Sequence, residues 1–204
     1  MNLKETKYDD KTYESLIKFM KFPRFSLGKD WDGLKEFEKL DIEEKEIVFY
    51  AENIASMNHF KLLIKELIEN YKFRICYVTS IDNDPMLSTH DSQIKSFFIG
   101  SKTARTKFFL TLKAKILIMD MPDLETFHIK RSKTFPVHYV YVFHSMFSVH
   151  SYLRKGAIDN YDTIFCVGEH QIKEIQETEN FYQLKTKNLV RYGFGRLDYL
   201  IEKN

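Results

Sequence analysis

Short, continuously apolar runs recur along the chain and alternate with longer stretches in which polar and apolar residues are mixed. Charged residues, glycine or turn sequences bound these runs, as expected of buried strands. We predict about seven strands, at residues 46–52, 72–80, 96–100, 115–121, 138–145, 162–168 and 188–195. Because the runs are continuously apolar and do not alternate, they favour a parallel sheet that is covered on both faces.

Helical patterns separate most of these strands. Residues 55–70 carry apolar side chains at spacings of three and four, which is typical of one buried helix face. Residues 101–114, with Ser101 as a cap, also indicate a helix, as do residues 169–183 and 197–204. This alternation predicts an α/β fold: a doubly wound, mostly parallel, Rossmann-like sheet of about seven strands with helices on both faces.

The first 45 residues do not follow this rhythm. They are typical of one or two helices with a turn at residues 22–24, where Phe-Pro-Arg interrupts the pattern. We therefore divide the chain into an N-terminal helical extension, residues 1–45, and a Rossmann-like domain, residues 46–204. The sequence shows neither an internal repeat nor a low-complexity linker.

Composition is that of an ordinary globular protein: 44% of residues are hydrophobic, 29% are charged, and the net charge is +2. So small a net charge argues against a general nucleic-acid-binding protein, which carries a clear basic excess. No apolar run reaches the ~18 residues of a transmembrane helix, and the N-terminus lacks the apolar core of a signal peptide. We expect a cytoplasmic protein in which Cys76 and Cys166 are buried thiols inside strands.

Several motifs resemble those of the CDP-glycerol glycerophosphotransferases, the teichoic-acid primase and polymerase type of enzyme with a GT-B glycosyltransferase fold. Phe143-His144-Ser145 is similar to the family's Trp-His-Gly motif at a strand end, although Phe and Ser replace Trp and Gly. Tyr161-Asp162 resembles the "YD" strand start that follows in the family. Residues 193–198 resemble its Gly-Tyr-Pro-Arg-Asn-Asp turn, with Gly195 in place of proline, and residues 49–69 its first strand and helix.

The resemblance implies half of a GT-B fold, the N-terminal acceptor-side domain, without the second domain that usually holds the nucleotide. It implies a transferase of cell-wall or other cell-surface polysaccharide biogenesis. The donor would be CDP-glycerol or a similar nucleotide-activated group. The acceptor would be lipid-linked or polymeric, which suggests peripheral contact with the inner face of the cell membrane. We expect no cofactor, and the resemblance gives His144 the role of general base.

His144 is the leading candidate for chemistry because it stands at the end of the predicted strand 138–145. In open α/β sheets, ligands bind at the carboxyl ends of the strands. An imidazole has a reference pKa of about 6.5, so a neutral ring can accept a proton at cytoplasmic pH. A structural histidine that hydrogen-bonds to a nearby carbonyl group is the alternative.

A second group of residues is a candidate for binding phosphate or the acceptor. Ser145 would begin a helix whose free N–H groups face an anion, and Arg154 and Lys155 would add positive charge. The alternative for the two basic residues is a solvated basic face. Arg196 and Asp198 follow the last predicted strand, where a structural role, each holding the other, is the alternative to ligand binding.

Polar residues also follow the first two strands. Glu52 and Asn53 end the first strand and Ser80 ends the second, so a parallel sheet places all three at the same edge as His144. They are candidates for binding acceptor hydroxyl groups. Capping of the following loop or helix is the alternative.

The triplet Asp82-Asn83-Asp84 could hold a divalent cation, because paired oxygen ligands suit Mg²⁺ or Mn²⁺. Followed by Pro85, it is also a good turn sequence, and we favour the turn. The seven histidines show no close zinc spacing, so we predict no structural metal.

Two basic segments, residues 11–29 and 101–115, carry aromatic and aliphatic side chains among their lysines and arginines. Such helices either lie on anionic lipid or pack their apolar face on the sheet. The first reading supports an alternative function, a non-catalytic half-enzyme that docks on a membrane or a partner protein. A further alternative is another Rossmann-like enzyme, such as a relative of sugar-nucleotide epimerases.

Overall fold

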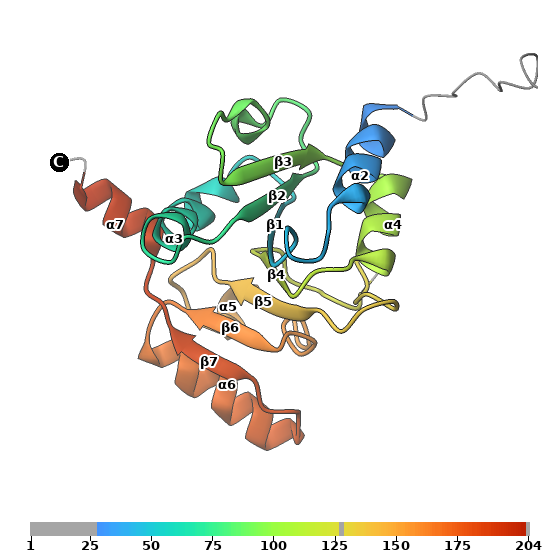
Figure 1. Cartoon of the computed structure of the whole chain (residues 1–204). Coiled ribbons are helices and arrows are strands. Elements are labelled where there is room, and N and C mark those ends of the chain that lie inside the picture. Colours follow the sequence, from blue (N-terminus) through green and yellow to red (C-terminus); the bar gives the residue numbers. More distant parts are fainter. Residues whose placement is uncertain (1–27, 127–128, 203–204) are drawn as a thin grey trace, which may run out of the picture.

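Seven parallel strands form one sheet in the computed structural model, which describes residues 28–126 and 129–202 (Figure 1). The predicted α/β fold is confirmed. The order across the sheet is β3-β2-β1-β4-β5-β6-β7, and every neighbouring pair is parallel. The strands are β1 (Ile47–Ala51), β2 (Ile75–Thr79), β3 (Ile94–Phe98), β4 (Ile116–Met119), β5 (His138–Val142), β6 (Thr163–Cys166) and β7 (Asn188–Arg191).

Helices connect these strands and cover the sheet on both faces. They are α2 (Lys29–Lys39), α3 (Met57–Glu69), α4 (Thr103–Thr111), α5 (Val149–Tyr152), α6 (Glu169–Tyr182) and α7 (Gly195–Glu202), with a short 3₁₀ helix, η1, at Pro85–Ser88. The chain builds outward from β1 to β3, returns through α4, and builds outward again from β4 to β7. The direction therefore reverses between β1 and β4, which is the point where open α/β sheets bind ligands.

The core consists of two apolar layers, one on each face of the sheet. One layer joins strand residues to buried side chains of α2, α4, α5 and α6, among them Phe108 and Phe109 of α4. The other joins the opposite face of the strands to α3 through Phe60, Ile64 and Ile68. Both faces of the central strands are buried, which is why their sequences are continuously apolar.

Helix α2 belongs to this core, although the sequence predicts an extension outside the α/β domain over residues 1–45. Its side chains Leu34 and Phe37 are buried in the first apolar layer. The backbone of α2 also lies so close to β3 that a Cβ atom on Gly33 would lie 2.0 Å from the carbonyl oxygen of Phe98. The folded unit therefore begins before residue 46, while the predicted turn at residues 22–24 lies outside the described residues.

The basic segment 101–115 is packed on the sheet, which supports that reading over the membrane reading. Phe108, Phe109 and Leu112 are buried. Lys107 pairs with Glu38 at 2.8 Å, so its charge is matched within the fold. Nearly all of the other basic segment, 11–29, lies outside the described residues. In the part of the chain that the structure describes, no helix is both long and apolar enough to span a bilayer.

Asp84 forms the predicted turn and is not an open cation ligand. Its carboxylate accepts hydrogen bonds from the Tyr77 hydroxyl at 3.0 Å, the Thr79 hydroxyl at 2.8 Å and the Met86 N–H at 2.9 Å. It thereby caps η1. Among the described residues, no group of three or more His, Cys, Asp or Glu side chains is placed to hold a metal ion.

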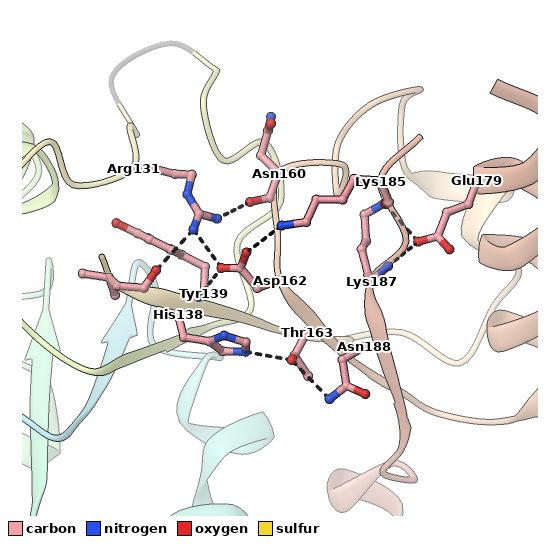
Figure 2. A network of polar contacts seen from close by, with 11 residues as sticks. Arg131, His138, Tyr139, Asn160, Asp162, Thr163, Glu179, Lys185, Lys187 and Asn188 are labelled. Atoms are coloured by element: carbon pink, nitrogen blue, oxygen red, sulfur yellow. Dashed lines mark hydrogen bonds and ion pairs between the residues drawn. The ribbon is translucent and has the colours of Figure 1, made fainter. Parts of the chain in front are cut away.

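The amino edge of the sheet carries a polar network centred on Asp162 (Figure 2). The carboxylate accepts from the Tyr139 N–H at 2.9 Å and from the Arg131 guanidinium at 2.8 Å. Burial acts to raise the pKa of Asp162, but these hydrogen bonds and the charge of Arg131 outweigh it and lower the pKa. Asp162 of the "YD" motif therefore joins β5 to β6 and to the segment before β5, at the edge of the sheet opposite His144.

Candidate functional site

A pocket of about 170 Å³ lies at the carboxyl ends of β1, β4 and β5. Segments that follow these three strands line it, together with the first turns of α3. The lining residues are Glu52, Asn53, Ala55, His59, Asp120, Met121, Pro122 and His144. Because β1 and β4 are the strands between which the chain reverses direction, the pocket occupies the topological switch point of the sheet.

His144 reaches this pocket just after β5 and is partly exposed. Its Nδ1 atom lies 3.1 Å from the carbonyl oxygen of Asp120 and 3.3 Å from the hydroxyl oxygen of Tyr141. A carbonyl oxygen can only accept a hydrogen bond, so we assign the proton of the neutral ring to Nδ1. This N–H group then donates a hydrogen bond to the Asp120 carbonyl. The other ring nitrogen, Nε2, then has a free lone pair, as a general base requires.

Asp120 follows β4 and is buried beside His144. The Ser56 hydroxyl donates to Asp120 Oδ1 at 2.9 Å across the switch point. Burial raises the pKa of Asp120, and the Ser56 hydrogen bond and the charge of His144 oppose that effect. One residue therefore contributes two groups to the site: a backbone carbonyl that orients His144 and a side-chain carboxylate.

A second histidine, His59 in the first turn of α3, faces the same pocket. Its ring centroid lies 6.1 Å from that of His144 and 6.1 Å from that of Phe194. The pKa of His59 is lowered to about 4, mainly by burial and in addition by positive charge on His144 and Arg196. His59 is therefore neutral at neutral pH, and it adds no positive charge to the pocket.

Glu52 and Asn53 line the pocket as the sequence predicts, and both also make local contacts. Glu52 pairs with Arg105 of α4 at 2.9 Å, where the arginine side chain is only 8% exposed. Asn53 Oδ1 accepts from the Ala55 N–H at 2.9 Å, which is the capping role named as its alternative. Ser80 does not line the pocket.

Ser80 instead fixes the ends of neighbouring strands. Its hydroxyl lies 2.7 Å from that of Tyr50 and donates to the Gly100 carbonyl at 2.6 Å. Burial raises the pKa of Tyr50 to about 12, while its contact with Ser80 acts to lower it. Ser80 thus has a structural role in holding β1 and the end of β3 together.

The expected phosphate-binding group does not assemble around His144. The helix expected near Ser145 begins at Val149 and has only 4 residues, and Ser145 Oγ accepts from the Phe147 N–H at 3.3 Å. Arg154 pairs with Asp123 at 2.7 Å. Lys155 lies over the Tyr182 ring, 3.6 Å from its centroid.

These two basic residues line a different pocket, of about 270 Å³, between α5 and α6. It shares no lining residue with the His144 pocket. The residues that could neutralise a phosphate beside His144 are therefore not Arg154 and Lys155.

Arg196 and Asp198 begin α7 and are both exposed. Within the described part of the chain, no ion pair joins them, in contrast to the structural role expected of them. Arg196 lies close enough to contribute to the lowered pKa of His59. Burial raises the pKa of Tyr192 to about 12, and the charge of Asp198 adds to that effect.

Three residues of the site are missing from the sequence predictions: Ser56, His59 and Asp120. Asp120 ends the apolar run 115–121, and a charged residue at that place is a signal that sequence reasoning could have used. Tyr161 is a further support, because its buried hydroxyl donates to the carbonyl of Met121 next to Asp120.

The sequence matches no known protein-family model and no curated protein. What the chain does is therefore inferred from the geometry of the switch-point pocket and from its motif resemblance.

Proposed function

We propose that this α/β domain is the acceptor-side domain of a group-transfer enzyme in which His144 is the general base. The observation that carries the proposal is the hydrogen bond from His144 Nδ1 to the Asp120 carbonyl, which leaves Nε2 as a proton acceptor at a switch-point pocket. The motif resemblance supplies the reaction class: transfer of a nucleotide-activated group, CDP-glycerol or similar, to a cell-surface polymer.

The reaction begins with an acceptor hydroxyl in the pocket. His144 Nε2 takes the hydroxyl proton while the acceptor oxygen forms a bond to the transferred group. The bond between that group and the nucleotide breaks, and its electron pair leaves with the nucleotide. The proton on His144 then passes to solvent, which returns the ring to its neutral form.

Orientation of the imidazole is the contribution of the surrounding residues. The Asp120 carbonyl selects the tautomer of His144, and the buried Tyr161 hydroxyl holds the neighbouring Met121 carbonyl. A ring that is fixed in this way loses less entropy when the acceptor binds, which is how positioned groups accelerate transfer.

The test is a transfer assay on the full-length protein, with CDP-glycerol and other nucleotide-activated donors. His144→Ala should lower turnover by about 10²- to 10⁴-fold, the usual contribution of general acid–base catalysis. His150→Ala is the matched control, because His150 is exposed and does not line the pocket. Turnover of a correctly folded His144→Ala variant near that of the wild type would remove this residue from the mechanism.

A second candidate function is a non-catalytic module that docks on a membrane or a partner protein. Exposed apolar side chains favour it: Leu197 and Ile201 are 44% and 66% exposed on α7, and Phe147 is 73% exposed near His144. Flotation with vesicles that contain anionic lipid should recover the full chain if the membrane form is correct. Replacing Phe147 and Ile201 with serine should abolish that recovery, whereas no flotation of the wild type would argue against this form.

A further inference from the structure

We infer that the switch-point pocket binds an uncharged polyol through two of its hydroxyl groups, one held by His144 and the other by the carboxylate of Asp120. This inference rests on the proposed function for the role of His144. It adds Asp120 as a binding residue and restricts the substrate class. A phosphate group of the substrate would then lie outside this pocket.

The charges of the lining residues disfavour an anion. Two carboxylates, Glu52 and Asp120, line the pocket with two imidazoles and the amide of Asn53, and neither lysine nor arginine is among the lining residues. Arg105 pairs with Glu52 but does not line the pocket. His59 adds no charge because burial keeps it neutral. Carboxylates repel phosphate and accept hydrogen bonds from hydroxyl groups.

Asp120 has a free acceptor site. Ser56 donates to Oδ1, and among the described residues no other side chain donates a hydrogen bond to this carboxylate, on which the backbone N–H of Asp120 also acts. Oδ2 is not among the described buried side-chain atoms that lack a partner, which is consistent with an oxygen open to the pocket. A ligand hydroxyl in the pocket would satisfy Oδ2 without adding charge.

The two acceptors are held in fixed relation to one another. The Asp120 carbonyl accepts from His144 Nδ1, so the backbone that positions the carboxylate also positions the imidazole whose Nε2 accepts the second hydroxyl. The volume of about 170 Å³ is below the ~300–1,000 Å³ of drug-sized ligand sites. Such a pocket fits one small polyol unit, such as the terminal unit of a longer acceptor.

The experiment is an NMR titration of the full 204-residue chain that follows the histidine ring signals. The probes are glycerol, 1-propanol and inorganic phosphate. Glycerol should shift the signals of His59 and His144, and 1-propanol should bind at least tenfold more weakly because it lacks the second hydroxyl. Phosphate at equal concentration should not displace glycerol.

Asp120→Asn should weaken glycerol binding about tenfold, because the neutral amide oxygen accepts a weaker hydrogen bond than the carboxylate does. Asp198→Asn is the matched control, since Asp198 is exposed on α7 and does not line the pocket. Equal affinity for glycerol and 1-propanol, displacement by phosphate, or unchanged binding by a folded Asp120→Asn variant would each overturn the inference. The ligand series on the wild-type chain decides the matter even if that variant does not fold.

Failure of this inference and failure of the proposed function give different results. Glycerol binding needs no donor, so selective binding that depends on Asp120 would stand even if His144→Ala left transfer unchanged. Conversely, loss of transfer in His144→Ala together with phosphate binding in the pocket would support the base and refute the polyol site.

Discussion

Removal of the Glu179 carboxylate should destabilise the fold more than removal of any exposed charge, because Glu179 and Lys187 form a buried ion pair (Figure 2). Their side chains are 5% and 2% exposed, and Lys187 Nζ lies 3.2 Å from Glu179 Oε1. The same oxygen accepts from the backbone N–H of Lys187 at 3.0 Å. The pair thus ties α6 to the segment that enters β7.

Glu179→Ala leaves a buried N–H without its acceptor, and it leaves the buried ammonium group without its counter-charge, with the Lys185 carbonyl 3.4 Å away as its remaining acceptor. Breaking a buried pair in this way costs ~3–5 kcal/mol, a large part of the ~5–15 kcal/mol by which a typical domain is stable. The double variant Glu179→Gln with Lys187→Met should lie within ~1 kcal/mol of the wild type, because no charge is then buried. The glutamine oxygen can still accept from the backbone N–H.

Urea denaturation measures these differences as shifts in midpoint at constant slope. Lys185→Ala is the control: its side chain is 86% exposed and its Nζ lies 3.8 Å from Asp162, so it should cost no more than ~1 kcal/mol. Loss of less than ~1 kcal/mol in Glu179→Ala would refute the reasoning. The reasoning would also be refuted if the double variant Glu179→Gln with Lys187→Met were as unstable to urea as Glu179→Ala.

Three further predictions concern the fold. Asp162→Asn should be less stable than the wild type at neutral pH. The difference should shrink as urea midpoints are measured below about pH 4, because a carboxyl whose pKa is lowered on folding loses its contribution as pH falls through the folded value. Gly33→Ala should cost at least ~3 kcal/mol or prevent folding, since its Cβ would meet the Phe98 carbonyl, whereas Gly195→Ala, with only ordinary contacts, should be near neutral in the same assay. Both cysteines should react with a thiol reagent only as fast as the chain unfolds, because they are buried and burial raises each pKa to about 12.

The type and order of most elements could be predicted from sequence because burial on both faces leaves a strong signal. The run 115–121 contains β4 (Ile116–Met119), and the pattern over residues 55–70 contains α3 (Met57–Glu69). The first and last residues of the strands and helices could be predicted less closely than their type and order. The apolar run 138–145 continues past Val142, the last residue of β5, because Phe143 is buried in the core without belonging to the strand.

Helix α2 shows a different limit of sequence reasoning. Its two buried positions, Leu34 and Phe37, are three residues apart among many charges, so its short amphipathic face gives a weak local signal. Its place on β3 and α4 depends on contacts far apart in the sequence. Periodicity alone can identify such a helix, but it cannot tell whether the helix joins the core.

The site depended on strand order, which no local pattern contains. His144 could be proposed from its place after an apolar run, but its partners come from α3 and from the segment after β4, which lie far from it in sequence. Only the reversal between β1 and β4 brings Ser56 and Asp120 together and leaves β5 next in the sheet. Conversely, Arg154 and Lys155 are close to His144 in sequence, yet the short α5 carries them to another pocket. The two carboxylates of the pocket thus come together through topology, and they support the proposed hydroxyl-binding site, whereas the two basic residues that were candidates for phosphate binding lie elsewhere.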